Sequence, residues 1–156
     1  MRIERDNPAR PDVARLLEQH LVDMHATSPP ESVHALDHAA LADPSITFWS
    51  ARDGAVLLGV GALNELSAVD GEIKSMRTAP AARNRGVAAS LLIHILDEAV
   101  GRGYRRVFLE TGTQDYFAAA RRLYRRHDFT ECPPFAGYRP DPNSVFMTRT
   151  LEPAGA

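Results

Sequence analysis

The sequence predicts an α/β fold in which helices pack against a mixed β-sheet. Strand-like and helix-like segments follow one another in the order helix, helix, two hairpin strands, then strand, helix, strand, helix, strand. The chain of 156 residues has the size of one domain with one core. Its hydrophobic content of 44% and charged content of 24% are ordinary for a globular protein.

The N-terminal part predicts two helices followed by two strands. The helices are expected over 11–24 and 33–41, and the strands over 46–51 and 55–63. Ser28-Pro29-Pro30 separates the two helices, because consecutive prolines break helical structure. The pair Asp53-Gly54 is typical of a hairpin turn and joins the two strands.

The rest of the chain predicts alternating strands and helices. Strands are expected over 72–78, 106–110 and 145–151, and helices over 87–99 and 116–126. The helix over 87–99 has the clearest apolar period, about 3.6 residues. In the strand expected over 72–78, strict alternation would put Glu72, Lys74, Met76 and Thr78 on one face and Ile73, Ser75 and Arg77 on the other.

Composition narrows the functional classes. The formal net charge of −2 gives no reason to expect a nucleic-acid partner. No apolar run is long enough to span a bilayer, and the N-terminus lacks the apolar core of a signal peptide, so no membrane association is expected. Cys132 is the only cysteine, which excludes an intrachain disulfide. We therefore expect a cytoplasmic protein, with residues 1–151 as one domain and 152–156 as a disordered tail.

The most informative segment is the loop before the helix over 87–99. A helix start exposes unpaired N–H groups and a partial positive charge, which together favour a phosphate. Gly86 lets the backbone approach a bulky anion, and Arg83 and Arg85 add positive charge. The loop lacks both the G-x-x-x-x-G-K-[ST] and the G-x-G-x-x-G patterns. Taken alone, it could equally be a basic surface loop.

The same loop resembles the acyl-CoA loop of the GNAT superfamily of N-acetyltransferases. The family pattern [QR]-x-x-G-x-[GA] corresponds to Arg83, Gly86 and Ala88. A second family pattern, A-x-x-L-Y-x-x-x-G-F, is similar to residues 120–129, and the resemblance covers about 48–151. Asp128 stands where the family usually has Gly, and Phe117 stands where many members have Asn. Further segments resemble a narrower, mostly uncharacterised, bacterial-type GNAT subgroup.

The resemblance implies a fold and a co-substrate. The fold would be a mixed, mostly antiparallel sheet of about six to seven strands flanked by about four helices. The co-substrate would be acetyl-CoA, and no metal is expected. Its pyrophosphate and pantetheine would contact, mainly through backbone atoms, Met76, Arg77, Thr78, Arg83, Asn84, Arg85, Gly86, Val87 and Ala88.

The resemblance also implies a general acid. The tyrosine of the second pattern, Tyr124, would protonate the departing thiolate, and its ordinary pKa of about 10 is close to that of a thiol. Glu72 is the first candidate for the base that accepts the amine proton, and Glu110 is the competing candidate. Glu72 and Met76 lie four strand residues apart, which is about 13 Å. Glu72 would therefore reach the amine near the thioester through a water relay. Either carboxylate could instead simply pair with Lys74 or Arg77.

The expected reaction is direct acetyl transfer, in a ternary complex, to the primary amine of a small molecule. A protein or peptide acceptor, and a CoA-binding regulatory module without catalysis, are the alternatives. The histidines His25, His34 and His38 lack the accompanying ligands of a metal site, so packing or solvated roles are expected. GNAT domains often dimerise, so a homodimer is also expected.

Overall fold

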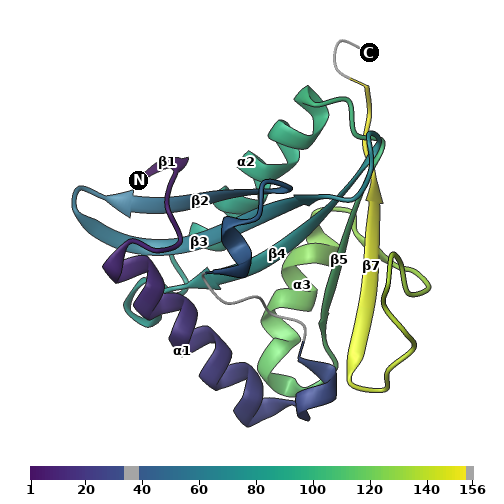
Figure 1. Ribbon diagram of the computed structural model, residues 1–156, viewed down its shortest axis with the longest axis horizontal. Coiled ribbons are helices and arrows are strands. Elements are labelled where there is room, and N and C mark those ends of the chain that lie inside the picture. Colours follow the sequence, from purple (N-terminus) through teal and green to yellow (C-terminus); the bar gives the residue numbers. More distant parts are fainter. Residues whose placement is uncertain (34–38, 154–156) are drawn as a thin grey trace.

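The structure is a computed structural model that describes residues 1–33 and 39–153 (Figure 1). In this part of the chain the strands are β1 (Arg2–Arg5), β2 (Ile46–Asp53), β3 (Val56–Glu65), β4 (Asp70–Thr78), β5 (Arg106–Gly112), β6 (Thr130–Glu131) and β7 (Ser144–Thr150). The α-helices are α1 (Pro11–Thr27), α2 (Val87–Gly101) and α3 (Ala118–Arg126). Short 3-10 helices are η1 (Pro30–Ser32), η2 (Ala40–Ala42), η3 (Pro80–Ala82) and η4 (Asp115–Phe117).

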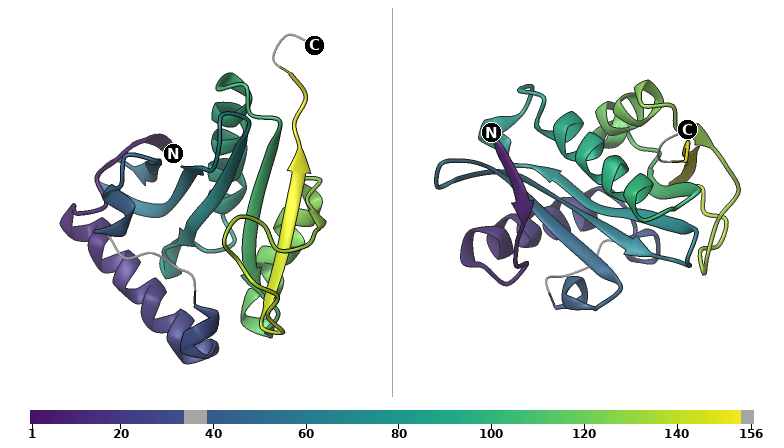
Figure 2. Two further views of the ribbon diagram at one scale, coloured as in Figure 1. Left: turned by 45° about the vertical axis from the view of Figure 1, so that its right-hand side comes forward. Right: turned by 90° about the horizontal axis from the view of Figure 1, so that it is seen from above.

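The predicted α/β fold class is confirmed. The described strands form one seven-stranded sheet in the order β1-β2-β3-β4-β5-β7-β6. Neighbouring strands in this sheet are antiparallel except for β4 and β5, which are parallel. Helix α1 covers one face of the sheet, and α2 and α3 cover the other (Figure 2). The sheet therefore separates two sides of the molecule, called here the α1 face and the α2/α3 face.

Some expected elements differ from the observed ones. Strands β1 and β6 were not predicted, because four and two residues are too short to show an apolar alternation. The expected helix over 116–126 begins as the 3-10 helix η4 and becomes α-helical at Ala118. Most of the helix expected over 33–41 lies outside the described residues, and its last part is η2. The expected disordered tail also lies largely outside them.

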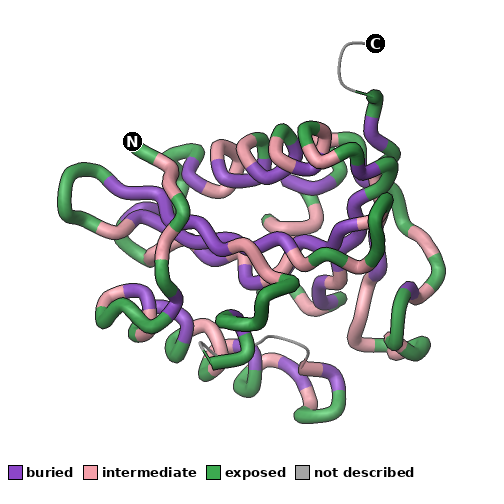
Figure 3. The backbone as a smooth tube through the Cα atoms, turned by 45° about the horizontal axis from the view of Figure 1, so that its top comes forward, coloured by how far each residue is buried: buried purple, intermediate pink, exposed green. Residues whose placement is uncertain are grey.

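Apolar side chains fill both faces of the sheet. Figure 3 shows that the buried residues follow the strands and the sides of the helices that face the sheet. On the α2/α3 face, Leu91, Leu92 and Ile95 of α2 are fully buried. On the α1 face, Val13 and Leu17 pack against β2 and β3. Each large apolar side chain buried in this way contributes about 1.5–3 kcal/mol, so packing fixes both helix positions. No helix in residues 1–33 and 39–153 is long and apolar enough to cross a membrane.

The sheet opens between β4 and β5. The two strands pair over only three residue pairs, from Asp70 with Arg106 to Glu72 with Phe108. Beyond Glu72 they diverge, while β5 stays paired with β7 as far as Gly112. The gap exposes backbone N–H and C=O groups along one side of β4, which a ligand can therefore use as partners.

A β-bulge changes which side chains of β4 share a face. Between the pairs Ala62–Lys74 and Val60–Arg77, β4 contains one more residue than β3. Ser75 lies in this bulge with a φ of 57°, in the left-handed region. The alternation predicted for β4 was therefore wrong beyond Lys74, because one extra residue exchanges the two faces.

The corrected assignment places the polar residues together. Glu72, Lys74 and Arg77 lie opposite Asn64, Ala62 and Val60 of β3, respectively, on the α1 face. Met76 contacts the α2 core beside Gly61, and Thr78 pairs with Gly59 beneath Val87 and Leu91.

Candidate active site

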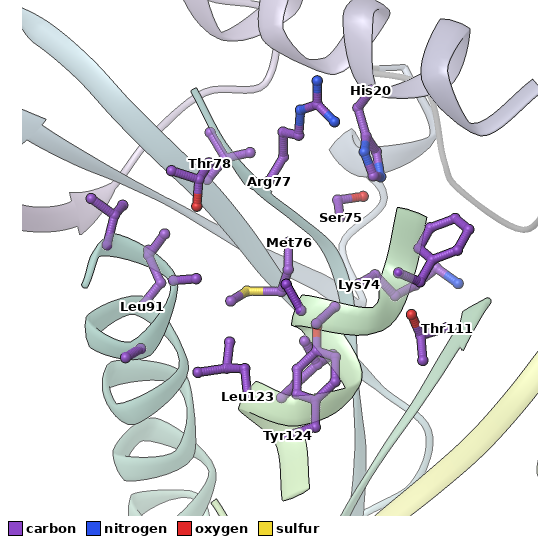
Figure 4. Close-up of a pocket in the computed structure, with 18 of the residues that line it drawn as sticks. His20, Lys74, Ser75, Met76, Arg77, Thr78, Leu91, Thr111, Leu123 and Tyr124 are labelled. Carbon is purple, nitrogen blue, oxygen red and sulfur yellow. The ribbon is translucent and has the colours of Figure 1, made fainter. Parts of the chain in front are cut away.

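A cavity of about 520 Å3 occupies the gap between β4 and β5 (Figure 4). Its walls come from both sheet faces, with His20 and Met24 of α1 at one end and Leu91 of α2 and Leu123 of α3 at the other. Because the sheet is split here, a molecule on the α2/α3 face and a molecule on the α1 face can meet inside one cavity.

The predicted phosphate loop forms one wall of this cavity. Gly86 caps the N-terminus of α2 with φ 76°, and Asn84 also has a positive φ of 64°. The N–H groups of the first helical turn have no intrahelical partner, and that turn of α2 holds no acidic side chain. A Cβ added to Gly86 would meet no atom within 4 Å, so the space before the helix is open. The loop geometry thus suits a phosphate.

Most residues predicted for co-substrate binding are brought together here. The predicted residues that line the cavity are Met76, Arg77, Thr78, Arg83, Asn84, Gly86, Val87 and Ala88. Arg85 is exposed and does not line it.

Tyr124 lines the cavity from α3 and is only 6% exposed. Its ring packs edge-on against Phe129, with 5.7 Å between ring centroids. Burial, together with the charge of Glu110, raises the pKa of Tyr124 above its usual value of 10. The phenol therefore keeps its proton at neutral pH and can donate a hydrogen bond.

Glu110 lies near the end of β5, opposite Phe146 of β7 and on the α1 face. Burial raises its pKa to about 7, and the charge of Glu72 adds to this shift. A carboxyl with a pKa near 7 exchanges its proton readily at neutral pH, as a general base requires.

Glu72 is held in a tighter network. It is 3% exposed and accepts hydrogen bonds from Tyr138 Oη at 2.6 Å, Lys74 Nζ at 3.3 Å and Asn64 Nδ2 at 3.3 Å. This is the pairing with Lys74 that the sequence left open. Of the two carboxylates, Glu110 is thus the one whose environment favours proton exchange.

Comparison with known proteins identifies the family. The sequence profile of the acetyltransferase (GNAT) family matches residues 13–129. The chain belongs to the GNAT family. The uncharacterized N-acetyltransferases YsnE of Bacillus subtilis and YedL of Escherichia coli are 50% and 49% identical to it, over 97% and 96% of this chain and 100% and 94% of theirs. It is therefore an N-acetyltransferase.

The fold agrees with solved GNAT structures. A candidate acyl-CoA N-acyltransferase from Klebsiella pneumoniae superposes with a TM-score of 0.79 at 25% identity, over 97% of each chain.

Both departures from the GNAT patterns have a structural explanation. Asp128 has a φ of 68°, in the left-handed region that Gly adopts without strain and that Asp tolerates. Phe117 is 7% exposed, lines the cavity, and packs directly over Gly112. It therefore supplies an apolar wall where many GNAT members have an amide.

Sequence reasoning missed several cavity residues on the α1 face. These are His20, Lys74 and Ser75, with Tyr116 and Tyr138; Thr111, which pairs with Val145, lines the cavity from the α2/α3 face. His20 gave one signal, since it is a polar residue on the apolar face of α1. Ser75 gave none, because a bulge is not visible in a single sequence. Of the three histidines considered for a metal, His34 and His38 lie outside the described residues.

Proposed function

We propose that this GNAT protein transfers the acetyl group of acetyl-CoA to the primary amine of a small molecule, directly and within a ternary complex. The supporting observation is the cavity through the split sheet. It has the phosphate loop and Tyr124 on the α2/α3 face and Glu110 on the α1 face. Such an arrangement lets the two reactants enter from opposite sides and meet without a covalent enzyme intermediate.

The residues on the α2/α3 face fit acetyl-CoA. The backbone of 83–88 would hold the pyrophosphate, because the open N-terminus of α2 and Arg83 offer N–H groups and charge. The unpaired edge of β4 at 76–78 would hydrogen-bond the pantetheine arm, as a neighbouring strand would. When bound, acetyl-CoA supplies the activated thioester carbonyl.

The proton transfers are assigned to Glu110 and Tyr124. Glu110 would accept a proton from the acceptor amine, whose nitrogen then forms a bond to the carbonyl carbon. As the carbon–sulfur bond breaks, Tyr124 would donate its phenolic proton to the sulfur. The second proton that the nitrogen loses as it becomes an amide would restore the phenol. Glu72 would stay in its pair with Lys74 and hold that part of the cavity wall.

An unbiased acceptor screen tests the proposed function. The protein is incubated with acetyl-CoA and mixtures of small amines or peptides, and the release of free CoA is measured. We expect turnover with small primary amines. Turnover with peptides alone would contradict the small-molecule acceptor, and binding of acetyl-CoA with no turnover of any acceptor would support a non-catalytic module.

Gly86→Asp should weaken CoA binding at least about 100-fold. A carboxylate here would face the pyrophosphate, and two like charges 4 Å apart repel by about 4 kcal/mol near a protein surface. Gly86→Asn is the matched control, since both side chains tolerate the left-handed φ of 76° and only one is charged. Calorimetric titration with CoA measures both affinities. Equal affinity in the two folded variants would overturn this placement of the pyrophosphate.

We further propose that residues 1–151 act as one domain, in the cytoplasm and as a homodimer. Light scattering at micromolar concentration should then give twice the chain mass of 17.1 kDa. A monomeric mass would contradict the dimer.

A further inference from the structure

The α1 face of the cavity contains polar atoms without partners. Within residues 1–33 and 39–153, five buried side-chain atoms lack any hydrogen bond, and three of them belong to residues that line the cavity. These three are Nδ1 of His20, Oγ of Ser75 and Nε of Arg77. A buried polar group without a partner is costly, so three in one wall point to a ligand that satisfies them.

Two of the three groups, those of Arg77 and Ser75, are held in fixed positions. The guanidinium of Arg77 donates to Asp23 of α1 and to the hydroxyl of Tyr116 in η4, which leaves its Nε–H unused. Ser75 is fixed by the bulge of β4, at a φ that residues other than Gly adopt only at a cost. Figure 4 shows Ser75 pointing from β4 toward His20, and Arg77 extending from β4 toward α1.

The chemistry of these groups is that of a site for oxygen acceptors. Arg77 Nε–H can only donate, the Ser75 hydroxyl can donate, and a neutral His20 can carry its proton on Nδ1. Arg77 also brings a positive charge, which makes a hydrogen bond to an anion stronger than one to a neutral group. Three unpartnered donors in the lining of one cavity fit the two oxygens of a carboxylate.

The other end of the α1 face has the opposite character. Glu110 lies there, together with Glu72, whose charge is offset by Lys74. An amine would therefore be drawn to the Glu110 end. At the other end the charge of Arg77 is shared with Asp23, and the unused Nε–H of Arg77, with the donors of Ser75 and His20, would bind an anion. A molecule carrying both groups would be oriented with its nitrogen near the gap between β4 and β5.

We propose that the acceptor is an amino acid or a similar small amine with a carboxylate, and that Arg77 Nε, Ser75 Oγ and His20 Nδ1 bind this carboxylate. This inference rests on the proposed function, because it names the acceptor class of the same site. Charge-assisted hydrogen bonds of this kind should favour the carboxylate about 10- to 100-fold over its amide.

Kinetics on matched acceptors test the proposal with the wild-type protein. Each of a panel of free L-amino acids is compared with its own carboxamide and with the amine that lacks the carboxyl group. We expect kcat/KM to be highest for the acid, at least about tenfold above both analogues. In Ser75→Gly, which accepts the left-handed φ without strain, this ratio should fall. Equal kcat/KM for acid, amide and amine would overturn the inference and leave the proposed acetyltransfer intact.

A second readout does not depend on turnover. Burial, and then the charge of Arg77, lower the pKa of His20 to about 4, whereas Asp23 opposes the shift. A carboxylate bound beside His20 would favour its protonated form and raise this pKa. Imidazole NMR signals, assigned with His20→Gln, should show the rise with an N-acetyl amino acid, the reaction product, and not with its amide. No change with either compound would contradict the carboxylate site, even if acetylation of amines is observed.

Discussion

Replacing Tyr124 with Phe should lower kcat by about 100- to 10,000-fold and leave acetyl-CoA binding nearly unchanged. The ring keeps its contact with Phe129, and only the hydroxyl is lost. Without that donor, the sulfur must leave as an unprotonated thiolate inside a largely apolar cavity. The measurement is single-turnover acetyl transfer with a good acceptor, because slow product release would hide the loss in the steady state.

The pH profile gives a further expectation for Tyr124. Because burial raises its pKa above 10, ionisation of this phenol should produce no alkaline decline below pH 10 in the wild type. Tyr104→Phe is the matched control. Tyr104 is another buried tyrosine, whose hydroxyl donates to Glu65 at 2.7 Å beside β4 and outside the cavity lining. Full kcat in Tyr124→Phe, or equal losses in both variants, would reduce Tyr124 to a packing role.

Replacing Glu110 with Gln should also lower kcat/KM by about 100- to 10,000-fold. In the wild type, kcat/KM should rise with pH through about 7, because Glu110 accepts a proton only when it is ionised. Gln cannot ionise, so this rise should vanish in the variant. Glu72→Gln is the discriminating comparison and should keep the rise, since Glu72 serves the pair with Lys74. If the rise vanished in Glu72→Gln and persisted in Glu110→Gln, Glu72 would be the base.

The stability of Glu110→Gln provides a readout independent of catalysis. A carboxyl whose pKa is raised on folding binds more protons in the folded state, so its contribution to stability is lost as pH rises from about 4.5 to 7. Gln lacks this loss. Urea unfolding should therefore show the variant gaining about 1–3 kcal/mol relative to the wild type across that range. A difference in unfolding free energy between variant and wild type that stays constant from about pH 4.5 to 7 would mean that folding does not raise the pKa of Glu110.

The sequence predicted the fold well where a segment was long and periodic. Helix α2 and strands β2, β3 and β7 lie within a few residues of their expected bounds, because their apolar patterns extend over a strand or several helical turns. β1 was missed because it is short and largely charged, and is positioned by pairing with β2. Pairing of this kind depends on distant residues that local patterns do not contain.

The candidate site was predicted unevenly for a similar reason. The loop at 83–88 and Tyr124 belong to short contiguous patterns, so the sequence identified them. The α1 face of the cavity is assembled from α1, the bulge of β4, and the loop after β6, which no contiguous pattern connects. The bulge at Ser75 also reversed the expected face of Met76 relative to Glu72. A one-residue change in register cannot be read from alternation alone.

The short seam between β4 and β5 has a mechanical consequence. Among the described strands, these three residue pairs are the only backbone ladder that joins β1, β2, β3 and β4 to the other three strands, β5, β7 and β6. A seam this short would allow the two parts of the sheet to move relative to each other, so the width of the opening should depend on side chains that bridge it. One brace is the bond from Tyr138 to Glu72, which ties the loop after β6 to β4. Changes in that loop should therefore alter the width of the opening between β4 and β5, and with it the affinity for the proposed co-substrate.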